Sequence, residues 1–186
     1  MKRLFDFSFS FIIVCCLVIP FLILCVLYKF KSDGPLIHWS RRIGENGNEF
    51  FMPKIRTMKI GAPNVATHLL KNPNLFFTKR GAFLRKYSLD ELPQVWSILV
   101  GKMSFVGPRP ALFNQYDLIN LRAKIGIDKL KPGLTGWAQV NGRDSLSLTE
   151  KVGFDMEYLN KKSFIFDLKI LFLSAIKSFA SYDVSH

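Results

Sequence analysis

The stretch Tyr87–Pro110, YSLDELPQVWSILVGKMSFVGPRP, contains a predicted helix and a pair of adjacent carboxylates. A helix is predicted from near Leu89 to Gly101, where glycine ends it. At its start Asp90 and Glu91 stand side by side, although the chain has 26 Lys and Arg against 14 Asp and Glu. Because neighbouring like charges repel, this pair calls for a physical explanation.

Helix capping is the simplest explanation of the acidic pair. Ser88 and Glu91 fit the capping box S-x-x-E, or Asp90 itself caps the helix and Pro93 falls in the first turn. Either way both carboxylates lie at a helix N-terminus, where the macrodipole favours their ionised form. We therefore expect a low pKa for Asp90. On local sequence alone, capping and catalysis both remain open.

Composition limits the classes of partner. The formal net charge is +12, yet 49% of the residues are hydrophobic. A basic and apolar chain fits a membrane surface with anionic lipid, or phosphate-rich substrates, better than it fits nucleic acid. The cysteines, Cys15, Cys16 and Cys25, share one apolar run, which argues against a disulfide framework, and no Cys/His spacing resembles a zinc site.

Residues 1–31 are predicted to be a membrane-inserted helical anchor. The run Phe7–Tyr28 has no charge and would span about 33 Å as a helix. Pro20, near its middle, predicts a kink. Basic residues flank the run on both sides: Lys2, Arg3, Lys29 and Lys31. Both flanks meet the positive-inside rule only if the chain enters and leaves on one face, so a re-entrant helix-break-helix and a spanning helix both remain open.

Residues 32–186 are predicted to form one catalytic domain of the α+β, helix-rich class with a small sheet. A strand pair is predicted at Leu36–Ile43 and Glu49–Met58, around the turn signal GENGN. A helix is predicted at Ala111–Arg122, and a structured loop with a short strand at 131–143. The last helix, Phe166–Tyr182, has apolar residues at i, i+3, i+4 and i+7. It is either a core helix or an amphipathic helix in the membrane interface.

Basic residues surround the acidic pair in sequence. The candidates for substrate binding are Lys54, Arg56, Arg85, Arg109 and Arg143. Arginine suits bidentate contact with phosphate oxygens, and a divalent cation would help to neutralise two carboxylates beside a diphosphate. Each residue also has a structural explanation, such as a turn at Arg109 or a solvated strand position at Arg56.

Three motifs in order, SLDELPQ (88–94), GKMSFVGPRP (101–110) and KPGLTGWAQVNGR (131–143), resemble the bacterial sugar transferase family. These are monotopic phosphoglycosyl transferases that act on polyprenol phosphate, and this chain resembles their short, catalytic-core form. The resemblance implies transfer of a sugar 1-phosphate from a UDP-sugar to polyprenol phosphate, with release of UMP. It implies a place at the cytoplasmic face of the bacterial inner membrane, in contact with lipid and without nucleic acid.

The resemblance also implies roles for the acidic pair. Asp90 is the expected nucleophile, which forms an acyl phosphate, and Asp90 and Glu91 are the expected ligands of Mg²⁺. Two positions depart from the family pattern. Lys102 replaces the usual Asp of GDMS, and Ile19 replaces the small polar residue that often precedes the proline of the re-entrant helix.

Two other functions compete with catalysis. A membrane-tethered basic module could bind anionic lipid or nucleic acid without catalysis. A protein with the same fold could also have lost the reaction and serve as a scaffold, with Lys102 as the residue that suggests it. The sequence does not identify the sugar or the glycan pathway.

Overall fold

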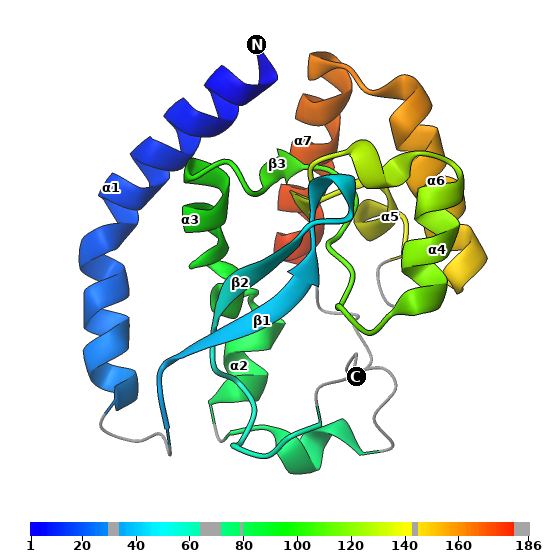
Figure 1. The fold of residues 1–186 in the computed structure, drawn as a ribbon. Coiled ribbons are helices and arrows are strands. Elements are labelled where there is room, and N and C mark those ends of the chain that lie inside the picture. The colour runs from blue at the N-terminus through cyan, green and yellow to red at the C-terminus, as the bar shows by residue number, and fades with distance from the viewer. Residues whose placement is uncertain (30–33, 64–71, 79, 143–144, 181–186) are drawn as a thin grey trace.

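The computed structural model describes residues 1–29, 34–63, 72–78, 80–142 and 145–180 (Figure 1). It confirms the α+β, helix-rich class with small sheets. In chain order the helices, strands and 3₁₀ turns (η) are α1 Lys2–Lys29, β1 Ile37–Ile43, η1 Glu45–Gly47, β2 Glu49–Ile55, η3 Pro73–Phe76, α2 Gly81–Lys86, η4 Leu89–Glu91, α3 Gln94–Leu99, β3 Ser104–Val106, α4 Tyr116–Lys124, η5 Ile127–Lys129, β4 Gly133–Thr135, α5 Trp137–Val140, α6 Leu148–Lys161 and α7 Phe164–Ala180.

The predicted hairpin is confirmed. β1 and β2 pair antiparallel from Ile37↔Ile55 to Ile43↔Glu49. Side chains alternate between the two faces of a strand, so Trp39 is 55% exposed whereas Ser40 is buried. The register sets His38, Ser40 and Arg42 of β1 opposite Lys54, Met52 and Phe50 of β2. The inner face of the hairpin thus carries basic side chains beside apolar core residues.

A second small sheet joins two motifs that are distant in sequence. β3 pairs parallel with β4, which confirms the short strand predicted within 131–143. The Gly107 nitrogen, just after β3, donates to the Thr135 carbonyl at 2.9 Å. A Cβ on Gly107 would overlap the Lys131 carbonyl, and a Cβ on Gly133 would overlap the Gly107 backbone. Glycine is therefore required where these backbones approach each other.

α1 runs as one helix from Lys2 to Lys29 with Pro20 inside it. The predicted break at Pro20 is therefore not confirmed. The segment Lys2–Pro20 has a mean hydropathy of 1.9 and meets the length and composition of a membrane span. Most of its apolar side chains are exposed, among them Phe7, Phe11, Ile12, Val18 and Ile19.

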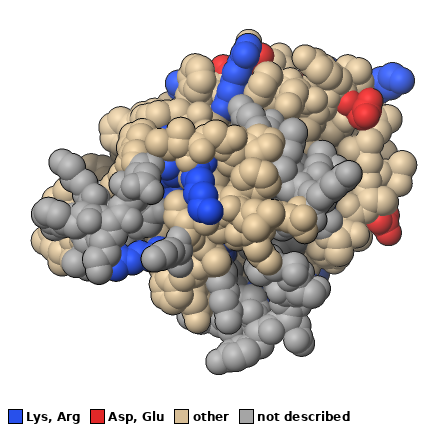
Figure 2. Space-filling view, turned by 90° about the horizontal axis from the view of Figure 1, so that it is seen from below, with Lys and Arg blue, Asp and Glu red and all other residues tan. Residues whose placement is uncertain are grey.

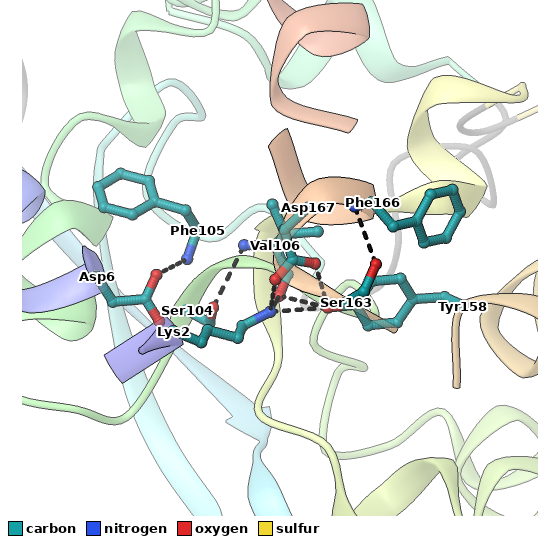
Figure 3. A network of polar contacts seen from close by, with 9 residues as sticks. All are labelled: Lys2, Asp6, Ser104, Phe105, Val106, Tyr158, Ser163, Phe166 and Asp167. Atoms are coloured by element: carbon teal, nitrogen blue, oxygen red, sulfur yellow. Dashed lines mark hydrogen bonds and ion pairs between the residues drawn. The ribbon is translucent and has the colours of Figure 1, made fainter. Parts of the chain in front are cut away.

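The first turn of α1 packs into the core of the domain (Figure 3). The Lys2 ammonium donates to the Val106 carbonyl at 2.8 Å, the Tyr158 hydroxyl at 2.7 Å and the Asp167 carboxylate at 2.7 Å. Asp6, which is buried, accepts from the Phe105 nitrogen at 3.2 Å. The start of α1 thereby contacts β3, α6 and α7. The predicted boundary between residues 31 and 32 stays a prediction.

Arg3 adds a contact to another element. Its Nη1 and Nη2 donate to the carbonyls of Ile98 and Leu99 at 2.7 and 2.9 Å. These carbonyls lie at the C-terminal end of α3, where a cation also interacts favourably with the helix dipole. In Figure 1, α1 lies along one flank of the molecule next to α3.

Several predicted helix boundaries were wrong. The helix predicted from Leu89 to Gly101 is a 3₁₀ turn, η4, followed by the short helix α3. α4 begins at Tyr116 and not at Ala111. We did not expect α6, although its start has a clear signal, because Ser147 and Glu150 form a capping box.

α7 confirms the predicted last helix, but its buried side differs from the predicted apolar stripe. Ile170 is fully buried, while Phe166, Leu171 and Leu173 are partly buried against the core. A second apolar stripe is exposed instead: Ile165, Leu168, Phe172 and Ile176. The membrane-interface role of α7 is not confirmed and stays a prediction.

Candidate active site

The acidic pair lies in η4, one turn before α3. Ser88 has a left-handed backbone, with φ of 54°, and its side chain makes no capping hydrogen bond. The N-cap of α3 is Pro93. Both capping predictions are therefore wrong, because the chain turns sharply at Ser88 before the helix begins. Leu89 packs against the small cluster around Ile55, which fixes η4 on the hairpin.

Glu91 is held by two cations. Its Oε1 accepts from Lys54 Nζ at 3.1 Å and from Arg109 Nη2 at 2.6 Å. Burial raises the pKa of Glu91, but the charges and hydrogen bonds of Arg109 and Lys54 outweigh it and keep the pKa well below its usual range. Glu91 is therefore ionised throughout the physiological range. The sequence prediction that Lys54 and Arg109 belong to the site is consistent with this cluster.

Asp90 differs from Glu91 both in its hydrogen bonds and in the direction of its pKa shift. Its side chain is buried, at 5% exposure, and within the described residues its carboxylate has no hydrogen bond and no ion pair. Burial raises the pKa of Asp90 above its usual value, although Lys54, Arg85 and Arg109 oppose the shift. The expected low pKa is wrong, because α3 does not start at Asp90 and burial dominates. Within the described residues, a carboxylate without a hydrogen bond thus lies beside one that is paired with two cations.

Two further arginines act on this pair through their charge. Arg85 donates to Thr57 Oγ1 at 2.9 Å, packs on the Phe77 ring at 5.0 Å and lowers the pKa of Asp90. Arg42, which sequence reasoning missed, faces the same cluster from β1. Burial and then Arg109 lower the pKa of Arg42 to about 9, so it remains charged at neutral pH.

The site carries more positive than negative charge. The cations that act on the acidic pair or on one another here are Arg42, Lys54, Arg85 and Arg109. A diphosphate would supply the missing negative charge, and arginine is well suited to its oxygens. The two strands of the hairpin, the helix α2 and the loop after β3 contribute these residues.

The structure shows no hydrogen bond or ion pair with the acidic pair for the other residues that the sequence singled out, as far as it describes them. Arg56 Nε donates to the Pro35 carbonyl at 2.9 Å, at the base of the hairpin, and Arg143 lies outside the described residues. Trp137, which follows β4, packs against Phe166 with ring centroids 5.0 Å apart. Lys102 lies beyond the C-terminal end of α3, the end opposite to the acidic pair.

An ion pair that the sequence did not indicate supports the loop of Arg109. Arg122 of α4 pairs with Asp155 of α6 at 2.6 Å, and its Nη1 also donates to the Arg109 carbonyl at 2.7 Å. Asp155 is 1% exposed. Local patterns give no signal for this contact, because the three residues come from separate parts of the chain.

Figure 2 shows one face of the molecule from below. Basic side chains are seen near the middle of this face and at several places along its margin, whereas the acidic ones seen in this view lie only toward the margin. This face suits an anionic ligand or an anionic lipid surface.

The expectation of a magnesium ion shared with substrate stays a prediction. Among the described residues, no group of three or more His, Cys, Asp or Glu side chains could hold a metal. Mg²⁺ is commonly bound by one or two carboxylates together with substrate phosphates. Asp90 and Glu91 are hard oxygen ligands of this kind, so a diphosphate could complete such a site.

Comparison with known proteins identifies the family. The family model "Bacterial sugar transferase" matches residues 1–181. The chain is 36% identical over 181 residues to the uncharacterized sugar transferase EpsL of Bacillus subtilis (strain 168), covering 97% of this chain and 88% of EpsL. It is 36% identical over 186 residues to the exopolysaccharide production protein ExoY of Sinorhizobium fredii, covering 92% and 82%.

A longer relative shares the same region. The UDP-glucose:undecaprenyl-phosphate glucose-1-phosphate transferase of Escherichia coli (strain K12) is 40% identical over 179 residues. These cover 91% of this chain but 36% of that protein. The family match spans all three motifs and agrees with the resemblance found in the sequence. The chain belongs to the bacterial sugar transferase family.

Proposed function

We propose that the protein transfers a sugar 1-phosphate from a UDP-sugar to a polyprenol phosphate, with Asp90 as the nucleophile. The observation that carries the proposal is the contrast within the acidic pair. Lys54 and Arg109 neutralise Glu91, whereas Asp90 has no hydrogen bond from the described residues. A carboxylate without a fixed partner is free to attack, and relatives are named for this donor and acceptor.

The chemistry balances without a proton transfer. An Asp90 oxygen forms a bond to the phosphorus that carries the sugar, the bond from this phosphorus to the bridging oxygen breaks, and UMP leaves with that oxygen. An oxygen of polyprenol phosphate then attacks the same phosphorus and releases the Asp90 carboxylate. The raised pKa of Asp90 reflects poor solvation of its charge, which favours attack.

The other residues of the site have distinct roles in this proposal. Arg109 and Lys54 form ion pairs with Glu91. In this proposal the same two cations also contact the diphosphate of the donor when it binds beside Glu91. Arg42 and Arg85 add positive charge around the reacting phosphate. Mg²⁺, when bound by Asp90 and Glu91, would neutralise charge on the leaving phosphate.

The proposal includes a monotopic arrangement at the cytoplasmic face of the bacterial inner membrane. The start of α1 is tied to the domain through Lys2 and Asp167, and the end of α1 leads into β1 of the same domain. Both ends of α1 therefore connect to the same domain, which is consistent with a re-entrant path; that path further requires a break at Pro20, which the continuous helix does not show. The exposed apolar stripe of α7, with Ile165 and Phe172, supports contact with the lipid interface.

A basic binding module without catalysis is not favoured. The described cations that act on Asp90 and Glu91 form a compact cluster around them, and the whole-chain family match adds to this. A binding module would need no unpaired buried carboxylate at the centre of that cluster.

The test is release of UMP by purified protein in detergent, with Mg²⁺, polyprenol phosphate and a panel of UDP-sugars. We expect release of more than one UMP per protein molecule for at least one UDP-sugar, and only when polyprenol phosphate is present to regenerate Asp90. Asp90→Asn should fall to background, while Arg41→Gln, on the outer face of β1 and paired with Glu49, should retain activity. UMP release by Asp90→Asn at the wild-type rate would overturn the role of Asp90.

A further inference from the structure

The loop that carries Arg109 is fixed at each of its backbone carbonyls. Pro108, Arg109 and Pro110 each have a carbonyl oxygen that accepts a hydrogen bond from another part of the chain. The donors, in the same order, are the Gly133 nitrogen at 2.9 Å, Arg122 Nη1 at 2.7 Å and Arg42 Nη1 at 3.0 Å. Such complete pairing of a short loop means that its position is set from outside, by residues remote in sequence.

The central donor, Arg122, is itself held in place. Its Nε and Nη2 both donate to Asp155 Oδ2, at 3.0 and 2.6 Å. The side chains of Arg122 and Asp155 are 11% and 2% exposed. The planar guanidinium thereby fixes its third contact, to the Arg109 carbonyl, in one direction. The pair joins α4 and α6 behind the loop.

Arg109 needs such support because its own side chain is loosely enclosed. The side chain is 42% exposed, yet Nη2 lies 2.6 Å from Glu91 Oε1. A long, exposed side chain has many rotamers, and the flanking prolines restrict the backbone on both sides of Arg109 without fixing its position in space.

We infer that Arg122 is a positioning residue for the reaction: oriented by Asp155, it holds the Arg109 carbonyl and so aims the Arg109 guanidinium at Glu91 and the diphosphate of the donor. This inference rests on the proposed function. It goes beyond the acidic pair and its cations, because Arg122 contacts neither the pair nor, in this account, the substrate. The competing explanation is that Arg122 only ties α4 to α6.

A double-mutant cycle separates the two explanations. Arg122→Lys keeps a cation near Asp155 but cannot bridge two acceptors with a rigid fork. It should lower kcat/KM for UMP release by about 10- to 100-fold, as expected for a charge-assisted hydrogen bond. In an Arg109→Lys background the same change should cost less than about threefold, because the guanidinium it aims is already gone.

Stability and donor binding provide the independent readouts. Arg122→Lys should change the melting temperature by the same amount in both backgrounds. UDP affinity, measured by titration calorimetry on the same four proteins, should show the same non-additivity as kcat/KM. Asp155→Asn serves as a second variant and should resemble Arg122→Lys in both measurements, whereas Arg41→Gln should leave them unchanged.

Different results would overturn the positioning role of Arg122 and the proposed transferase function. Equal losses from Arg122→Lys in both backgrounds, or no loss in the wild-type background, would overturn the positioning role. Absence of UMP release by the wild-type protein would contradict the proposed function instead, and the UDP titrations would still decide whether Arg122 acts through Arg109.

Discussion

Replacing Lys2 by methionine removes the ammonium that ties α1 to the core while it keeps the length of the side chain. Three acceptors lose the hydrogen bond from Lys2: the Val106 carbonyl, the Tyr158 hydroxyl and the Asp167 carboxylate (Figure 3). Asp167 retains one hydrogen bond, from Tyr158 at 2.7 Å. A nearly buried carboxylate is thereby left without a counter-charge.

The expected loss in the free energy of unfolding lies between the values for breaking a buried and an exposed ion pair. The side chain of Lys2 is 39% exposed and that of Asp167 is 9% exposed. Breaking a buried pair costs about 3–5 kcal/mol and an exposed pair less than about 1 kcal/mol. We therefore expect a loss of about 2 kcal/mol, which corresponds to about 4–8 °C in melting temperature for a chain of this size.

Thermal unfolding in detergent, followed by intrinsic tryptophan fluorescence, measures this effect. The matched control is Lys102→Met, since Lys102 is exposed and, within the described residues, its ammonium makes no hydrogen bond or ion pair. Asp167→Asn should destabilise by a similar amount, and the double variant should lose less than the two single losses combined. A change below about 1 °C for Lys2→Met, or strict additivity, would refute the argument that this network fastens α1 to the domain.

Three further predictions concern the site and its supports. Asp90→Asn should raise the melting temperature at pH 8, because the raised pKa of Asp90 means that its negative charge opposes folding. The gain in melting temperature should shrink as the pH falls from the pKa of Asp90 in the folded protein toward the ordinary value of 3.8. A gain that does not depend on pH would contradict this reasoning. Gly133→Ala should lower the free energy of unfolding, measured by chemical denaturation, by about 1–3 kcal/mol, because the added Cβ would overlap the Gly107 backbone. The control is Gly153→Ala, which should show no loss because no atom lies within 4 Å of its added Cβ. Lys102→Asp should leave UMP release within about twofold, because the residue lies at the end of α3 remote from Asp90, and a tenfold change would show that the side chain reaches the site.

Local patterns predicted the hairpin, the last helix and the candidate pair. The alternation around Ile37–Ile43 and Glu49–Ile55, with a turn at Asn46, is a signal within a few residues, and the structure follows it. The helical period of α7 is equally local. The acidic pair could be located because Asp90 and Glu91 are adjacent in sequence.

Long-range contacts could not be predicted in the same way. The pKa of Asp90 depends on burial by elements far away in the chain, so its direction was wrong when argued from a helix terminus alone. Arg42 and Arg122 bind carbonyls of the Arg109 loop from 68 and 13 residues away in the sequence, and no periodicity or motif marks such pairs. The helix expected from Leu89 was divided because the left-handed turn at Ser88 and the following proline favour a separate 3₁₀ turn.

The central claim is that Asp90 forms a covalent bond to the sugar phosphate. Intact-mass measurement of the protein incubated with an active UDP-sugar and Mg²⁺, without polyprenol phosphate, tests this claim most directly. We predict an added mass equal to one sugar phosphate, which disappears when polyprenol phosphate is supplied, is absent from Asp90→Asn and maps to the peptide containing Asp90. An adduct that persists in folded Asp90→Asn, or turnover by the wild-type protein through no adduct on the Asp90 peptide, would contradict the account.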